Sequence, residues 1–275
     1  MAFTKPTKLL HDLHPSLARA RHTNKMEVLS PGLMISYSDN NGARIGYPTV
    51  AQKNLLINGA AAARRIMRTT VAEMDRVVFF RRPEGQAFTN IMNYHFGLAA
   101  NRANPTLVDN IVDKPFSLRA IAHKDRRSIL NQIRMGMLSI SFHINTGVYL
   151  IDVDNGVRAG AGAGVEGYVN GPADLTGLFS AFKNGEIHVA FAACQANGYT
   201  AEAVARVIIH EAAHKYWGVE DQHYAHNLAP YRQHDADLSL DNADSFAWAA
   251  LSLDQGQLIH GVNSMDLHQQ LAPIP

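Results

Sequence analysis

The stretch Thr200-Ala-Glu-Ala-Val-Ala-Arg-Val-Ile-Ile-His-Glu-Ala-Ala-His-Lys-Tyr-Trp-Gly218 decides how the rest of this chain is interpreted. It predicts a single helix, because Thr200 is a typical N-cap and Gly218 is typical of the position just past a helix end. Four residues separate His210 from His214, so both side chains lie on one face of this helix. Their imidazoles can therefore bind one metal ion.

Glu211 completes a His-Glu-x-x-His pattern, which is typical of zinc hydrolases. In that arrangement two neutral histidines hold Zn²⁺ and the glutamate acts as general base on the attacking water. The chain has 14 histidines, and chance alone would produce the pattern somewhere in about 2% of such sequences. Small and aliphatic neighbours indicate a buried helix, where two histidines and a glutamate are costly unless a metal satisfies them. We therefore expect a zinc site.

The third protein ligand that catalytic zinc usually has is not decided by this helix alone. The pattern with Gly three residues and His or Asp six residues after the second histidine is absent, because Trp217 and Glu220 occupy these positions. A carboxylate on a later helix, Asp241 or Asp244, is one candidate. Nearby histidines could also substitute as ligands or line a cleft, namely His223, His226 and His234.

Three further segments carry a family resemblance. They are Gly218-Val-Glu-Asp-Gln-His-Tyr224, Asn242-Ala-Asp244 and, upstream, Tyr94-His-Phe-Gly97. They resemble the Gly-Thr-x-Asp-x-x-Tyr, Asn-Ala-Asp and aromatic-Phe-Gly elements of the aspzincin metallopeptidases, the family of deuterolysin and peptidyl-lysine metalloendopeptidase. The motifs follow the family's order over roughly residues 49 to 250.

The resemblance implies a role for each matching residue. His210 and His214 match the zinc-ligand histidines, and Asp221 matches the third ligand. Glu211 matches the general base, and Tyr224 matches the tyrosine that stabilises the oxyanion. We therefore expect these five side chains to lie close together in the folded protein.

Asp244 matches the aspartate of the family's Asn-Ala-Asp segment. We predict that it binds substrate by lining the pocket that receives the residue after the scissile bond. A hydrogen bond to a zinc-ligand histidine and a helix-capping role are its alternatives. In lysine-specific members an acidic residue lies three positions further on. Ala247 occupies that position here, so strict lysine specificity is not expected.

Hydrophobic periodicity predicts the other elements. Residues 1–48 are expected as an N-terminal extension with a turn at Ser38–Gly42 between short extended pieces. Helical spacing then predicts helices over Val50–Met74, with Thr49 as N-cap, over Phe88–Phe96 and over about Leu118–Met135.

The period changes to two after residue 137, which is typical of half-buried strands. Strands are expected over Leu138–Ile144, over its hairpin partner Val148–Val153 and over Glu186–Cys194, whose edge could pair with an extended substrate. A further hairpin turn is expected at Asn155-Gly156.

These patterns predict an α+β, zincin-like fold. The metallopeptidase domain is expected over residues 49–275, with a helical part at 49–137 and a part that holds the sheet and the zinc site at 138–275. The sheet should be small and mostly antiparallel. A second helix should follow the zinc helix and line the cleft.

Composition limits the partners and the compartment. With 25 Lys plus Arg and 24 Asp plus Glu, the net charge of +1 gives no electrostatic reason to expect nucleic acid. We expect no membrane span, no Sec signal peptide and, with a single cysteine at Cys194, no intrachain disulfide. These features favour a cytoplasmic protein or one exported by a signal-independent route; they say nothing of oligomeric state.

The function expected from the sequence is that of a zinc-dependent endopeptidase, which hydrolyses bonds of a peptide or protein substrate through a metal-activated water. Two alternatives stay open. One is a secretion-system toxin or effector protease with a specific protein target. The other is a non-catalytic zinc-binding protein that retains the fold.

Overall fold

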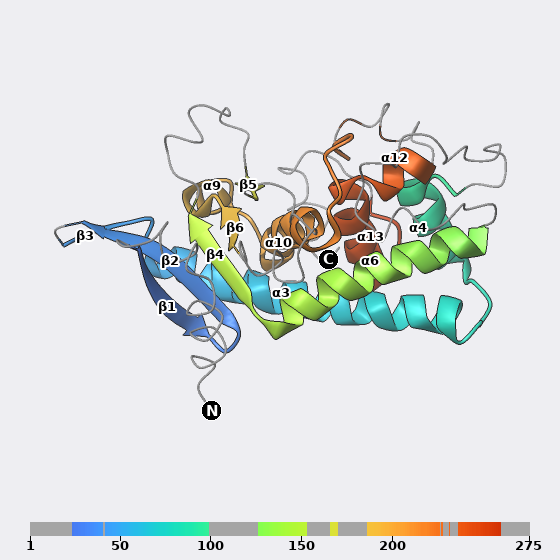
Figure 1. The fold of residues 1–275 in the computed structure, drawn as a ribbon, viewed down its shortest axis with the longest axis horizontal. Helices are drawn as coiled ribbons and strands as arrows, with labels where there is room; N and C mark the ends of the chain where they lie inside the picture. Colours follow the sequence, from blue (N-terminus) through green and yellow to red (C-terminus); the bar gives the residue numbers. More distant parts are fainter. Residues whose placement is uncertain are drawn as a thin grey trace, which may run out of the picture.

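The computed structural model describes residues 24–40, 42–98, 126–152, 166–169, 186–225, 227, 231 and 236–259. In these ranges a set of long helices lies beside a six-stranded sheet, with helix α10 (Ala201–Trp217) between them (Figure 1). The predicted α+β class is confirmed.

Helix α3 (Val50–Met74) has the bounds that the sequence predicts. A reciprocal capping box begins it, in which the Gln52 amide donates to Thr49 Oγ1 and the Thr49 amide donates to Gln52 Oε1, at 3.3 and 2.8 Å. The helix continues into a π-helical turn, η1 (Asp75–Phe79). The local sequence around Thr49 therefore determines where α3 begins.

Helix α4 (Gln86–Phe96) contains the upstream motif and ends at Gly97, which has φ +61°. The His95 ring lies 2.8 Å from the Tyr231 hydroxyl and 3.1 Å from Ser252 Oγ. The Phe96 ring packs edge-on against Phe246, with 5.2 Å between centroids. The motif thus supports α13 (Ala243–Gln255), the second helix that the sequence predicts.

Helix α6 (Arg126–Thr146) contradicts the strand predicted over Leu138–Ile144. Its buried side chains follow helical spacing through that stretch: Ile133, Met137, Ile140 and Ile144. The apparent alternation arises because Phe142, 67% exposed, lies on the outer face. An apolar residue on the solvent-exposed face of α6 therefore produced a two-residue hydrophobic pattern in a helix. Residues 118–125, where this helix was expected to begin, lie outside the described residues.

Among the described strands the sheet is mixed, with three antiparallel and two parallel strand pairs, and the predicted hairpin between Leu138–Ile144 and Val148–Val153 is wrong. Its strands are β1 (Asn24–Ser30), β2 (Leu33–Asn40), β3 (Ala43–Ile45), β4 (Val148–Asp152), β5 (Gly167–Tyr168) and β6 (Glu186–Val189). The order is β1-β2-β4-β6-β5, with β3 paired to β2. β4 pairs in parallel with β2 and β6, whereas the β1–β2, β2–β3 and β5–β6 pairs are antiparallel.

Chain connectivity explains the parallel pairs. Helices α3, α4 and α6 separate β2 from β4 in sequence, and such helical crossovers connect parallel strands. Three of the strands come from residues 24–45, within the expected N-terminal extension. The strand expected over Glu186–Cys194 ends at Val189, and helix α9 (Phe191–Ala196) follows it. The turn expected at Asn155-Gly156 lies outside the described residues.

Helix α10 packs against α3, α6 and α13 and also against strands β5 and β6. The approach of α3 requires a glycine, because a Cβ at Gly59 would lie 2.4 Å from Val204 Cγ1. In this central position α10 is surrounded by other helices and strands. A short helix, α12 (Ala236–Leu240), precedes α13.

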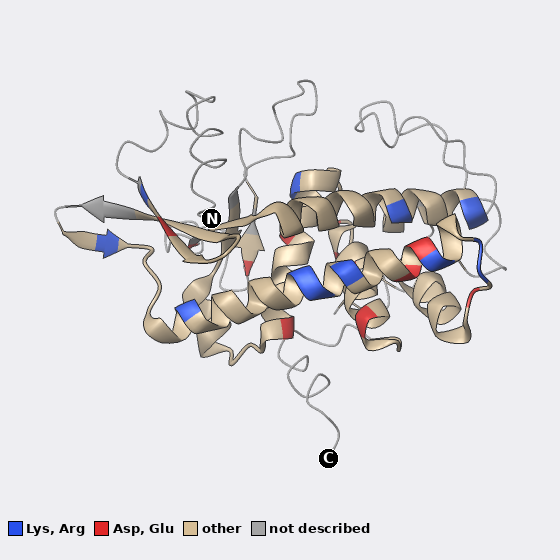
Figure 2. Ribbon diagram, turned by 90° about the horizontal axis from the view of Figure 1, so that it is seen from below, with Lys and Arg blue, Asp and Glu red and all other residues tan. Residues whose placement is uncertain are grey.

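Charge is distributed unevenly among the described segments of the chain, although the net charge of the whole sequence is near zero. Lys and Arg lie along α3, η1 and α6 (Figure 2), where residues 50–98 and 126–146 hold ten basic and three acidic residues. The described part of residues 186–259 holds two basic and nine acidic residues. The candidate metal ligands therefore lie in a described segment with an excess of acidic residues, which attract cations.

Two expectations from composition concern the membrane and disulfides. Among the described helices, none combines the length and the hydropathy that a membrane span requires. Cys194 is buried, and as the single cysteine of the chain it has no intrachain partner for a disulfide.

Candidate metal centre

The two motif histidines project from the last turns of α10, which begins and ends where the sequence predicts. Thr200 Oγ1 accepts a hydrogen bond from the Ala203 amide at 3.2 Å, and Gly218 ends the helix with φ +76°. The His210 and His214 rings lie nearly perpendicular, with 4.8 Å between their centroids. The helix therefore presents both imidazoles on one face, as expected.

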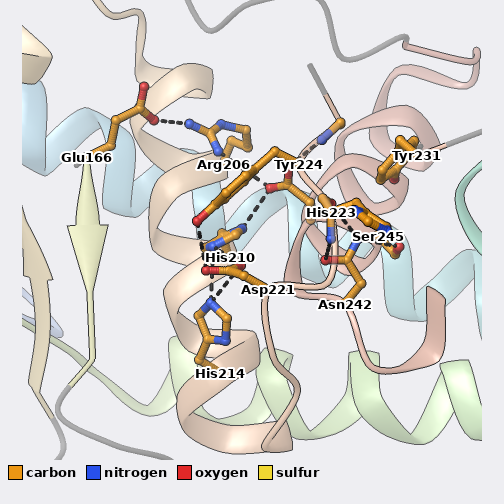
Figure 3. A network of polar contacts seen from close by, with 12 residues as sticks. Glu166, Arg206, His210, His214, Asp221, His223, Tyr224, Tyr231, Asn242 and Ser245 are labelled. Atoms are coloured by element: carbon orange, nitrogen blue, oxygen red, sulfur yellow. Dashed lines mark hydrogen bonds and ion pairs between the residues drawn. The ribbon is translucent and has the colours of Figure 1, made fainter. Parts of the chain in front are cut away.

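Asp221 joins the two histidines in a compact triangle of ligand atoms (Figure 3). His210 Nε2 and His214 Nε2 are 3.1 Å apart, and Asp221 Oδ1 lies 3.1 and 3.2 Å from them. Metal–ligand distances of about 2.0–2.1 Å place the ligand atoms of a regular tetrahedron about 3.3–3.4 Å apart. The triangle is within a few tenths of an ångström of that spacing, so the donor set fits a zinc ion.

The other ring nitrogens fix the tautomer that metal binding needs. His214 Nδ1 donates to the Val219 carbonyl at 2.6 Å, and His210 Nδ1 donates to Asp244 Oδ1 at 2.7 Å. A proton on Nδ1 leaves the Nε2 lone pair of a neutral imidazole available to a metal. When both imidazoles are neutral, their lone pairs are therefore on the nitrogens that converge with Asp221.

The loop that returns Asp221 to the histidines is held against the start of α13. The Glu220 amide donates to the Asp241 carbonyl, and the Ala243 amide donates to the Glu220 carbonyl, at 3.1 and 2.9 Å. The Asn242 side chain donates to the His223 carbonyl at 2.9 Å. These hydrogen bonds explain how a short loop can hold the Asp221 carboxylate next to the two histidines.

Asp244 lies behind His210, and its side chain is 3% exposed. One carboxylate oxygen accepts from His210 Nδ1, and the other accepts from the Ala225 amide at 2.7 Å. These contacts support the alternative in which Asp244 orients His210, whereas its substrate-binding role stays a prediction.

Glu211 is buried beside the edge strand β5. Its Oε2 atom has no hydrogen-bond partner among the described residues. A Cβ at Gly167 would lie 2.7 Å from Glu211 Oε1 and 2.8 Å from the His188 carbonyl oxygen. Only a residue without a side chain allows this approach, and the unpartnered oxygen leaves Glu211 able to accept a proton from water.

Tyr224 lies over the centre and is 42% exposed. Its hydroxyl donates to Asp221 Oδ2 at 3.0 Å, and its ring stacks at 17° to the His210 ring, with 6.3 Å between centroids. The structure thus brings together four of the residues implied by the resemblance, with Glu211 next to them on α10.

The electrostatics of the centre favour a cation. Burial disfavours charge on His210, but Asp221 and Asp244 outweigh it and raise its pKa to about 10. Burial also opposes ionisation of Asp221, yet its bonds to His210 and His214 hold its pKa well below the usual range. Burial raises the pKa of Glu211. A field that favours a proton on His210 also favours a metal ion, because the two compete for the same lone pair.

The other candidate ligands do not join the triangle. Asp241 Oδ2 accepts from the Gln222 side chain at 2.9 Å, and His223 contacts Asn242 through its backbone. His226 and His234 lie outside the described residues.

Sequence reasoning missed Arg206, Glu166 and Gly167, which adjoin the centre. Arg206 and Glu166 are 40 positions apart, and no local pattern joins them. A glycine-rich tract before Gly167 is a weak signal, since such tracts are ordinary in loops. The contact between Arg206 and Glu166 therefore could not be predicted from the sequence, because the two residues are far apart along the chain.

The comparisons leave the chain's family open. No model of a protein family, no curated protein and no solved structure matches the chain. The aspzincin resemblance therefore depends on the short motifs alone.

Proposed function

We propose that this protein is a zinc-dependent endopeptidase. The observation that carries the proposal is the convergence of His210 Nε2, His214 Nε2 and Asp221 Oδ1 within 3.1–3.2 Å beside a buried carboxylate. Three protein ligands with an adjacent glutamate are typical of catalytic zinc sites. A purely structural zinc site would be closed by a fourth protein ligand.

In this proposal each side chain has a separate task. Zinc supplies a Lewis acid that polarises a carbonyl and makes water a better nucleophile at neutral pH. Glu211 accepts the proton of the attacking water and transfers it to the departing amine. Burial raises the pKa of Glu211, which makes its carboxylate a stronger base for the first of these transfers. The Tyr224 hydroxyl leaves Asp221 and donates to the oxyanion that forms on the substrate.

Strand β5 offers the edge for an extended substrate. The edge of the β6 strand was predicted for this purpose, but β6 pairs with β4 on one side and β5 on the other. β5 ends the strand order, so among the described strands its outer edge has no partner. Because Gly167 in β5 lies against Glu211, a peptide added to that edge would run past the general base.

Metal removal tests the proposal directly. We expect the purified chain to cleave an unfolded protein substrate, to lose cleavage after dialysis against a zinc chelator, and to regain it when zinc is restored. Mass spectrometry of the products reports internal cleavage sites. Zinc-loaded protein that cleaves none of a diverse peptide library would support the alternative of a non-catalytic zinc-binding protein.

Replacing Tyr224 by phenylalanine tests the oxyanion role. Loss of one oxyanion donor typically costs about 10²–10³-fold in kcat. We expect a loss at the lower end of that range with zinc still bound, because the three ligand atoms remain. Steady-state kinetics with zinc analysis of the same sample measures both. Tyr47→Phe is the control, since that hydroxyl bonds Glu27, remote from the centre; equal losses in the two variants would contradict the role.

A further inference from the structure

A charged network connects the strand beside Glu211 to the metal ligand His210. Arg206 lies one helical turn before His210 on α10, and its side chain is 10% exposed. Its guanidinium contacts Glu166 Oε2 (Figure 3) and lies 3.8 Å from Asp244 Oδ1. That same Asp244 oxygen accepts the hydrogen bond from His210 Nδ1.

Glu166 anchors the other end of this network. It immediately precedes β5, its carbonyl accepts from the Ala190 amide at 2.8 Å, and its Oε1 accepts from the Tyr199 hydroxyl. Its carboxylate therefore fixes the start of β5 to α10. The next residue, Gly167, lies against Glu211.

Arg206 supplies the guanidinium charge that lies between the two carboxylates of this network, Glu166 and Asp244. The planar guanidinium can face carboxylates on two sides, whereas a lysine ammonium is a single point charge. The guanidinium also lies 5.8 Å from the Trp248 ring centroid, within the range of a cation–π contact. Removing one partner of a buried ion pair leaves the remaining charge uncompensated, so loss of Arg206 should disturb both Glu166 and Asp244.

We propose that Arg206 is a positioning residue that holds strand β5 and the ligand His210 as one rigid unit. On one side it fixes β5 through Glu166, and on the other it fixes His210 through Asp244. Its catalytic meaning rests on the proposed peptidase function. Its effects on zinc affinity and on strand order do not depend on peptide cleavage.

Three variants separate the two sides of the network: Arg206→Met, Glu166→Gln and Asp244→Asn. Chelator competition measures zinc affinity, and hydrogen–deuterium exchange measures protection of peptides that contain residues 166–169. Loss of a group that orients a ligand typically weakens metal affinity 10–100-fold. We expect Arg206→Met to show this loss together with faster exchange, Glu166→Gln to show faster exchange only, and Asp244→Asn to show weaker zinc binding only.

Arg126→Met is the matched control, because it also breaks a partly buried Arg–Glu ion pair, with Glu84, away from the centre. It should leave zinc affinity and exchange at 166–169 unchanged. If Arg206→Met does not fold, Arg206→Lys should shift both measurements in the same directions by a smaller factor.

Two results would overturn the inference: an Arg206→Met protein with the zinc affinity of the parent, or one with unchanged exchange at 166–169. A parent chain that binds no zinc would contradict both this inference and the proposed function. If the parent binds zinc but cleaves no peptide, the proposed function fails, whereas the pattern among the variants still decides the role of Arg206.

Discussion

Glu211→Gln should bind zinc as the parent does and lose nearly all peptide cleavage. Glutamine keeps the shape of the side chain next to Gly167 but cannot accept a proton from water at neutral pH. General base catalysis typically contributes about 10²–10⁴-fold, so we expect kcat to fall by that factor. Steady-state kinetics on a zinc-loaded sample, with metal content determined on the same preparation, measures the effect.

Glu202→Gln is the control for this substitution. It makes the same chemical change on the same helix, in the first turn of α10, where the carboxylate contacts Arg65 at 3.4 Å and not the metal centre. Its kcat should match that of the parent. Peptide cleavage by Glu211→Gln at the parental rate would contradict the mechanism even if zinc is essential.

Asp221→Ala should have the largest effect on metal binding. The substitution removes one of three ligand atoms and also the acceptor of the Tyr224 hydroxyl. Loss of an orienting group costs 10–100-fold in affinity, so loss of a direct ligand should exceed about 100-fold. Chelator competition measures the zinc Kd. Thermal unfolding provides a second readout, because zinc at about 100 times Kd adds about 2.7 kcal/mol to the parent's stability and should add almost none to the variant's.

Asp241→Ala tests whether Asp221 or Asp241 is the third metal ligand, a choice that the residues alone left open. Asp241 accepts from the Gln222 side chain and is not part of the triangle. We expect its zinc Kd to stay close to that of the parent. Tight zinc binding by Asp221→Ala combined with weak binding by Asp241→Ala would instead make Asp241 the third ligand and remove the support for the aspzincin resemblance.

Elements with local signals could be predicted from the sequence. Helix α3 has the predicted bounds because a capping box begins it and its buried residues repeat at helical spacing. Helix α10 also has the predicted bounds, because Thr200 and Gly218 mark its ends. The spacing of His210 and His214 on that helix places their imidazoles on one face before any tertiary contact is known.

Elements that depend on distant contacts could not be predicted in the same way. Phe142 on the outer face of α6 gave a strand-like alternation, and solvent exposure is not visible in the sequence. The parallel pairing of β2 with β4 joins segments more than a hundred residues apart. The link from Glu166 through Arg206 to Asp244 likewise exists only after three separate segments have packed together.

The most direct test of the account is the zinc content of the chain, determined by elemental analysis on protein purified without chelator or metal-affinity tag, beside Asp221→Ala. The three converging ligand atoms predict about one zinc per chain in the parent and a markedly lower content in the variant. No zinc in the parent, even after reconstitution, would contradict the central claim.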